Sequence, residues 1–231
     1  MQCVLSRFPR GVRCFGYRGK DAPSRFDSMM SFNKQFVTSK LYSNYEVPLE
    51  NISLRCVVVT CMDSRLTHLL PAALNIKQGE AKIIKTAGAI IAHPFGGIMR
   101  SILLALYELR ATEVFVIGHD DCGMRTANPS STLEKMVRAG VPRDRFDVIE
   151  SSGFDLKKWL SGFSSLDDSV INSANIIRRH PLVPADLKVH GLIINPSTGA
   201  IRQAKDAEHV KMAGALAAEG KANNPNPNPK S

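Results

Sequence analysis

Three short runs rich in β-branched residues constrain the fold of this chain more than any other feature of its sequence. The runs are 56–60 (CVVVT), 81–86 (AKIIKT) and 114–118 (VFVIG), and each is followed by loop residues and then by a helical pattern. Their apolar residues are consecutive rather than alternating, which is typical of strands that are buried on both faces. The sequence therefore predicts a parallel sheet that is covered by helices.

Further patterns complete this sheet. A fourth run, 188–195, is followed by a turn, after which residues 200–202 are expected to return as a short hairpin strand. Apolar residues at helical spacing predict helices over 97–110 and 168–179, whereas 130–165 is less regular. The predicted fold class is α/β, with a mostly parallel central sheet of about four strands plus an antiparallel edge strand, flanked by helices.

The two ends of the chain differ in composition from its middle. Residues 1–28 are rich in arginine, which predicts a basic N-terminal arm or a mitochondrial transit peptide. Residues 205–231 are expected to form a C-terminal extension with a disordered tail, because the tail alternates Asn with Pro. A single α/β domain is then expected over 29–204, in an intracellular protein that is either mitochondrial or cytoplasmic.

Charge and hydropathy exclude two classes of partner. The net charge is +9, but outside residues 1–28 it is spread along the chain with no basic run, so nucleic-acid binding is not predicted. No apolar run approaches the roughly 18 residues that a membrane-spanning helix needs, so no membrane span is predicted. The five cysteines are an odd number and widely spaced, which indicates thiols or metal ligands rather than a disulfide framework.

Candidate metal ligands follow two of the predicted strands. Cys61 comes directly after the first run, and His119 and Cys122 follow the third. Because the carboxyl ends of parallel strands meet at the same edge of a sheet, these three side chains are expected to converge. One such Cys or His alone would be read as a core residue. Two thiols and one imidazole together form a donor set that zinc uses in catalytic sites, where a fourth position is left for water or substrate.

A carboxylate and a guanidinium adjoin the first of these ligands. Asp63 and Arg65 are two residues apart, so in an extended segment they would share a face. Two alternatives stay open. Asp63 is the fourth metal ligand and closes the site, or Arg65 restrains Asp63 so that the fourth position is open to water.

The order and spacing of these residues resemble the β-class carbonic anhydrases, over residues 36–201. The matching motifs are Cys61-x-Asp63-Ser64-Arg65, Ala87-Gly88 and His119-x-x-Cys122-Gly123. The resemblance implies one zinc per chain on Cys61, His119 and Cys122, with Asp63 and Arg65 as the catalytic dyad. It also implies a homodimer or homotetramer.

The implied reaction is the reversible hydration of carbon dioxide to bicarbonate and a proton by hydroxide on the zinc. The backbone of Ala87 and Gly88 is small enough to form a substrate pocket beside the metal. Two thiolates neutralise the charge of Zn²⁺, so alkaline conditions are expected to favour activity.

Other functions compatible with the same residues remain open. The chain has Lys85 and Thr86 where many members of the family have a basic residue and Asn, which could change hydrogen bonding near the pocket or the choice of substrate. A zinc hydrolase of carbonyl sulfide or carbon disulfide would need the same attack on a linear molecule. A low-activity homologue that senses zinc or bicarbonate is a third alternative. A thiol redox protein is disfavoured because the chain has no Cys-x-x-Cys motif.

Overall fold

The computed structural model describes residues 24–45 and 55–205, which belong to two separate compact units. The first unit contains helix α1 (Arg25–Thr38) and the 3₁₀ helix η1 (Leu41–Tyr45). The side chain of Ser24 caps α1 by accepting a hydrogen bond from the Asp27 N–H, at 3.1 Å. Helix α1 thus runs across residue 28, where the sequence suggested that an arm gives way to a domain. The other residues of the predicted transit peptide, and the tail after Lys205, lie outside the described residues.

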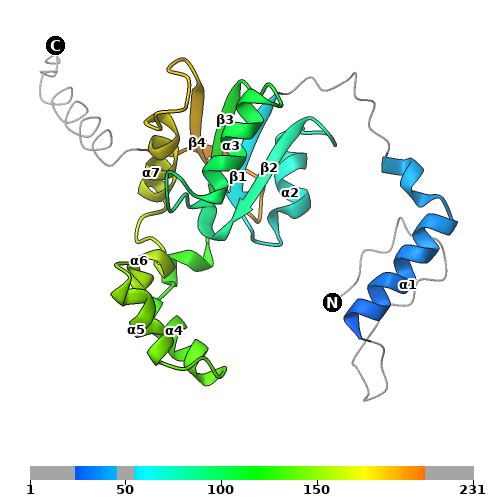
Figure 1. The fold of residues 1–231 in the computed structure, drawn as a ribbon. Helices are drawn as coiled ribbons and strands as arrows, with labels where there is room; N and C mark the ends of the chain where they lie inside the picture. The colour runs from blue at the N-terminus through cyan, green and yellow to red at the C-terminus, as the bar shows by residue number, and fades with distance from the viewer. Residues whose placement is uncertain (1–23, 46–54, 206–231) are drawn as a thin grey trace, which may run out of the picture. The chain divides into compact units, whose positions relative to one another are not determined.

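The second unit is built on a five-stranded sheet (Figure 1). Its order is β2-β1-β3-β4-β5, and all neighbours are parallel except the pair β4 and β5. The strands are β1 (Cys56–Cys61), β2 (Ala81–Thr86), β3 (Glu113–His119), β4 (Lys188–Ile194) and β5 (Ile201–Gln203). This confirms the predicted α/β class, with four parallel strands and an antiparallel edge strand.

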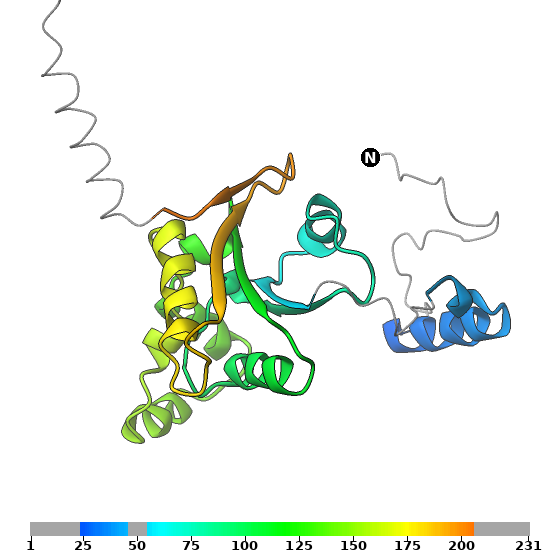
Figure 2. The same ribbon diagram turned by 90° about the horizontal axis from the view of Figure 1, so that it is seen from above.

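Helices cover both faces of this sheet. Helices α3 (Gly97–Tyr107) and α7 (Leu166–Arg178) pack their apolar residues on one face, and α2 (Leu66–Ala73) packs on the other. Figure 2 shows α7 and α2 on opposite sides of the strands. Strand β1 is buried along its whole length, as its sequence predicts. For β2 this prediction is wrong, since it lies at the sheet edge and leaves Ile83 38% exposed.

The two helices that the sequence predicts, α7 and α3, differ by a few residues from their predicted bounds. Helix α7 begins two residues earlier than predicted because the Ser165 hydroxyl accepts a hydrogen bond from the Asp168 N–H. The acidic residues in its first turn and Arg178 in its last turn stabilise the helix, because their charges are opposite in sign to the adjacent ends of the helix dipole. Helix α3 ends at Tyr107, and Arg110, its predicted last residue, has a left-handed φ of 56°.

The region 130–165 contains three helices that the sequence analysis described only as less regular. They are α4 (Pro129–Arg138), α5 (Asp144–Ser151) and α6 (Leu156–Leu160), and they project from the sheet in Figure 1. Neither α4 nor α5 fully buries a residue, but α4 has Leu133, Met136 and Val137 at helical spacing, a stripe that the sequence analysis missed. None of the helices in the described part of the chain is long and apolar enough to cross a membrane.

Candidate metal centre

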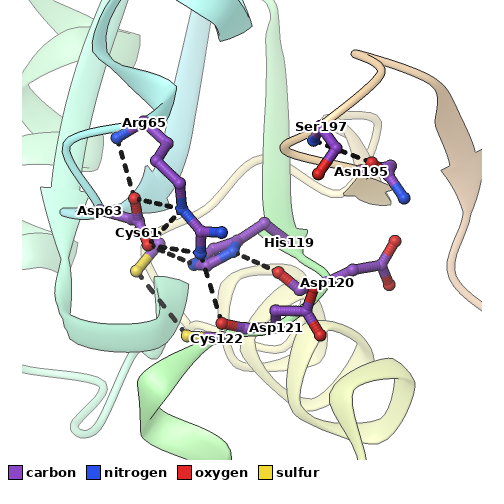
Figure 3. A network of polar contacts seen from close by, with 9 residues as sticks. All are labelled: Cys61, Asp63, Arg65, His119, Asp120, Asp121, Cys122, Asn195 and Ser197. Carbon is purple, nitrogen blue, oxygen red and sulfur yellow. Dashed lines mark hydrogen bonds and ion pairs between the residues drawn. The ribbon is translucent and has the colours of Figure 1, made fainter. Parts of the chain in front are cut away.

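Cys61, His119 and Cys122 come together at the carboxyl edge of the sheet. Strands β1 and β3 are parallel neighbours, so their last residues, Cys61 and His119, lie at the same edge. The turn after β3 then returns Cys122 to this point. The two sulfur atoms are 3.9 Å apart, and the ligand atoms of all three buried residues lie within 4.8 Å of one another (Figure 3). Such a group could hold a metal ion.

The ring of His119 is oriented for ligation through Nε2. Its Nδ1 lies 2.7 Å from the carbonyl oxygen of Asp120. Because a carbonyl oxygen only accepts, Nδ1 donates, and the neutral ring then has its lone pair on Nε2. Nε2 is buried and has no hydrogen-bond partner among the described residues. A buried imidazole with one nitrogen fixed by a backbone carbonyl and the other free is the arrangement found in metal-binding histidines.

The two thiols have opposite tendencies to ionise. Burial opposes ionisation of Cys61, but the adjacent His119 ring and the backbone N–H groups of Asp63 and Gly88 outweigh it and lower the Cys61 pKa. Burial, together with the nearby charge of Cys61, raises the pKa of Cys122. One thiolate therefore disfavours a second beside it, and a dication between the two sulfurs would offset this repulsion.

Asp63 and Arg65 form a two-point ion pair beside the cluster. They lie in the turn between β1 and α2 rather than in an extended segment. Arg65 Nη2 is 2.9 Å from Oδ2 and Nε is 3.1 Å from Oδ1, while the Arg65 N–H also donates to Oδ1 at 2.9 Å. These bonds lower the pKa of Asp63 to about 2. Asp63 Oδ2 is also 3.8 Å from His119 Nε2, so the carboxylate borders the candidate metal position.

Ala87 and Gly88 lie in the 3₁₀ turn η3 (Ala87–Ala89), directly after β2. Cys61 pairs with Thr86 in the sheet register, which places η3 beside Cys61. Gly88 has a left-handed φ of 71°, and a Cβ there would lie 3.0 Å from Met124 Cβ. A small, closely packed backbone thus borders Cys61.

A hollow of about 360 Å³ lies apart from the metal cluster. It is bordered by the segment after η3, by residues 162–165 and by a stripe of α7 that includes Asp168 and Asn172. None of the three candidate ligands lines it, and neither Asp63 nor Arg65 does.

Two contacts of the site escaped the sequence analysis. The carbonyl oxygen of Asp121 accepts a hydrogen bond from Arg65 Nη2, at 3.4 Å. The backbone N–H of Met124 faces the sulfur of Cys122 and offsets part of the rise that burial causes in the Cys122 pKa. Both involve backbone groups, which no residue pattern reveals. Their position beside the His119 and Cys122 motif was the only available signal.

Fold and site together define an α/β protein with a buried Cys-His-Cys cluster at the carboxyl edge of a parallel sheet. The family model described as carbonic anhydrase matches residues 56–201. The Bacillus subtilis protein "Putative carbonic anhydrase YvdA" is 50% identical over 174 residues, which cover 75% of this chain and 88% of that protein. The chain belongs to the β-carbonic anhydrase family.

Two further similar proteins have names that refer to different activities. The crystal structure of β-carbonic anhydrase isoform I from Trichomonas vaginalis is 32% identical, with a TM-score of 0.69, and the match covers 80% of this chain and 99% of that one. A carbon disulfide hydrolase from Acidithiobacillus thiooxidans is 26% identical over 158 residues, covering 64% of this chain and 76% of the relative. Proteins similar to this chain therefore carry the names of two different activities.

Proposed function

We propose that this protein catalyses the reversible hydration of carbon dioxide to bicarbonate and a proton, with one zinc ion per chain bound by Cys61, His119 and Cys122. The observation that carries the proposal is the convergence of these three buried ligands beside an Asp63–Arg65 ion pair. Two sulfurs and one imidazole suit the borderline-soft character of zinc. When bound, zinc would polarise a water molecule and lower its pKa, which supplies a nucleophile close to neutral pH.

Arg65 is assigned the role of holding the Asp63 carboxylate away from the metal position. Because it contacts both carboxylate oxygens, moving Asp63 onto the metal would require these bonds to break. This supports the alternative in which the fourth position is open to water. The arrangement with Asp63 as the fourth ligand would then be a resting state that forms when the ion pair opens.

Asp63 is assigned the role of orienting the attacking water molecule. A pKa of about 2 makes its carboxylate an acceptor throughout the neutral and alkaline range. It would accept a hydrogen bond from the water and direct a lone pair of that oxygen toward the carbon of CO₂. The backbone of Ala87 and Gly88 is assigned to the substrate pocket because η3 directly follows β2, whose last residue pairs with Cys61.

Hydrolysis of carbon disulfide or carbonyl sulfide is the second candidate function. Its support is the carbon disulfide hydrolase similarity together with Thr86, whose hydroxyl donates to the Ile90 carbonyl oxygen at 3.3 Å. Thr86 therefore directs its polar group to the backbone of the loop that continues from η3. An asparagine there, which the resemblance implies for many members of the family, would have an additional N–H donor.

Stopped-flow assays on the zinc-loaded protein separate these activities. CO₂ hydration is followed from about pH 6.5 to 9, and release of hydrogen sulfide from carbonyl sulfide and carbon disulfide is followed in parallel. We expect CO₂ hydration that increases toward alkaline pH. Asp63→Asn should abolish it, and the matched control Asp144→Asn, on exposed helix α5, should not. Sulfide release without CO₂ hydration would favour the second candidate, and zinc binding without either activity would favour a sensing role.

We also propose a homodimer or homotetramer. Exposed apolar side chains on the second unit support this, among them Tyr107 at 61% and Trp159 at 58% exposure. Light scattering of the full chain after size exclusion would give the mass, and a monomer at micromolar concentration would contradict the proposal.

The mitochondrial or cytoplasmic location also stays a proposal, to be checked by imaging the full-length protein in its own cells.

A further inference from the structure

The chain returns from the helices α4–α6 and packs directly against the turn that carries Cys122. This turn is η4 (Gly123–Thr126), whose N-cap residue is Cys122. The N–H of Phe163 donates a hydrogen bond to the carbonyl oxygen of Met124, at 3.3 Å. A Cβ at Gly162 would lie 1.7 Å from the same oxygen and 3.2 Å from Ala127 Cβ. Because real Cβ atoms do not approach within 3.0 Å, only glycine fits at position 162 without a shift of backbone.

Met124 connects this contact with both thiol ligands. Its backbone N–H is directed at the sulfur of Cys122. Its Cβ and Cγ atoms each lie 3.0 Å from the place that a Cβ on Gly88 would take. Gly88 in turn directs its N–H toward the sulfur of Cys61. Met124 therefore supplies the backbone amide that faces one candidate ligand, and its side chain packs against the residue whose amide faces the other.

We propose that Met124 and Gly162 are positioning residues of the metal centre, which together fix the spacing of the Cys61 and Cys122 sulfurs. The inference rests on the proposed zinc binding by these ligands. Because residue 162 is glycine, the segment after α6 can contact the Met124 carbonyl and fix the position of Met124. The Met124 side chain in turn packs against Gly88 and so fixes the position of η3. Groups that orient metal ligands typically change metal affinity by 10- to 100-fold when they are altered.

Gly162→Ala tests the proposal because a methyl group there must displace the Met124 carbonyl. The matched control is Gly97→Ala, where a Cβ has no atom within 4 Å. Zn²⁺ affinity is measured by competition with a chelator, and the absorption of the Co²⁺-loaded protein reports the thiolate ligands. We expect Gly162→Ala to weaken Zn²⁺ binding by about tenfold or more and to change the cobalt spectrum. Gly97→Ala should stay within about twofold of the wild type.

A second pair of variants keeps the test decisive if Gly162→Ala does not fold. Met124→Ala removes the contact with Gly88 and should also weaken Zn²⁺ binding, whereas Met124→Leu, of similar volume, should restore most of it. Circular dichroism of the metal-free variants distinguishes loss of folding from loss of affinity. Wild-type Zn²⁺ affinity and cobalt spectra in folded Gly162→Ala and Met124→Ala would overturn the inference and leave the proposed function intact. A wild-type protein that binds no zinc would overturn both.

Discussion

Gly118→Ala should destabilise the protein, because β3 and α7 approach each other too closely at Gly118 to admit a methyl group. A Cβ at this position would lie 2.7 Å from Val170 Cγ2 and 3.0 Å from Leu166 Cδ1. Val170 is only 1% exposed and packs in the core, so it cannot swing away into solvent. The helix must shift instead, by several tenths of an ångström, and His119 is the next residue along β3.

The expected loss of stability follows from the size of this overlap. Overpacking of a well-packed core costs about 1–3 kcal/mol, and the lower entropy of alanine in the unfolded chain returns about 0.4–1 kcal/mol. The two terms together give a net loss of about 0–2.6 kcal/mol. Because the overlap with the fixed Val170 side chain is close, we expect about 1–2 kcal/mol. For a chain of this size each kcal/mol lowers the Tm by about 2–4 °C, so the expected decrease is about 2–8 °C.

Thermal unfolding in the presence of a chelator measures this effect without a contribution from metal. Val170→Ala removes the contacting Cγ2 and by itself should cost about 2 kcal/mol. The double variant should lose about 1 kcal/mol less stability than the sum of the losses in the two single variants. The reason is that alanine at position 170 makes room for the new methyl group. A Gly118→Ala protein as stable as the wild type, or strict additivity in the double variant, would refute the packing explanation.

Three further variants test the site and its support. Cys122→Ser should lose zinc and thermal stability together, since metal binding is coupled to folding, and stoichiometric zinc in the purified variant would contradict this ligand assignment. Arg65→Gln should raise the pKa of Asp63 from about 2 toward its ordinary value of 3.8, as measured by NMR titration of the carboxyl group. In the wild type the stability that this carboxylate contributes is present above about pH 4 and is lost as the pH falls through about 2. An Asp63 pKa that does not change would show that Arg65 is not its main partner. Arg202 contacts both carboxylate oxygens of Asp167, at 2.7 and 2.9 Å, and lowers its pKa. Arg202→Gln should cost about 0.5–1 kcal/mol in urea unfolding at neutral pH. The difference should disappear at a pH low enough to protonate Asp167, and a difference that persists there would contradict its electrostatic origin.

The sheet was predictable because each of its parallel strands is encoded by a local run of apolar residues. Burial of β1 along its whole length matches its consecutive Val residues. The same reasoning overestimated the burial of β2, since a run such as AKIIKT does not reveal that its strand has a neighbour on one side only. Edge or interior position depends on the strand order, which is a property of the whole chain.

The ligand cluster was predictable for a related reason. In a parallel sheet, residues that directly follow two strands are brought to one edge whatever the details of the loops. Cys61 and His119 satisfy this condition, and Cys122 is close enough in sequence to follow. The positions of Met124 and Gly162 were not predictable, because their contact depends on how the chain returns after α4–α6. The apolar stripe of α4, formed by Leu133, Met136 and Val137, indicates a helix but not the path that the chain takes after it.

X-ray absorption at the zinc edge of the purified full-length protein, with zinc content determined on the same sample, tests the proposed metal centre most directly. We predict one zinc per chain, with two sulfur ligands at about 2.3 Å and two nitrogen or oxygen ligands at about 2.0–2.1 Å. A protein without zinc, or a zinc ion surrounded by nitrogen and oxygen alone, would contradict the assignment of Cys61, His119 and Cys122 as its ligands.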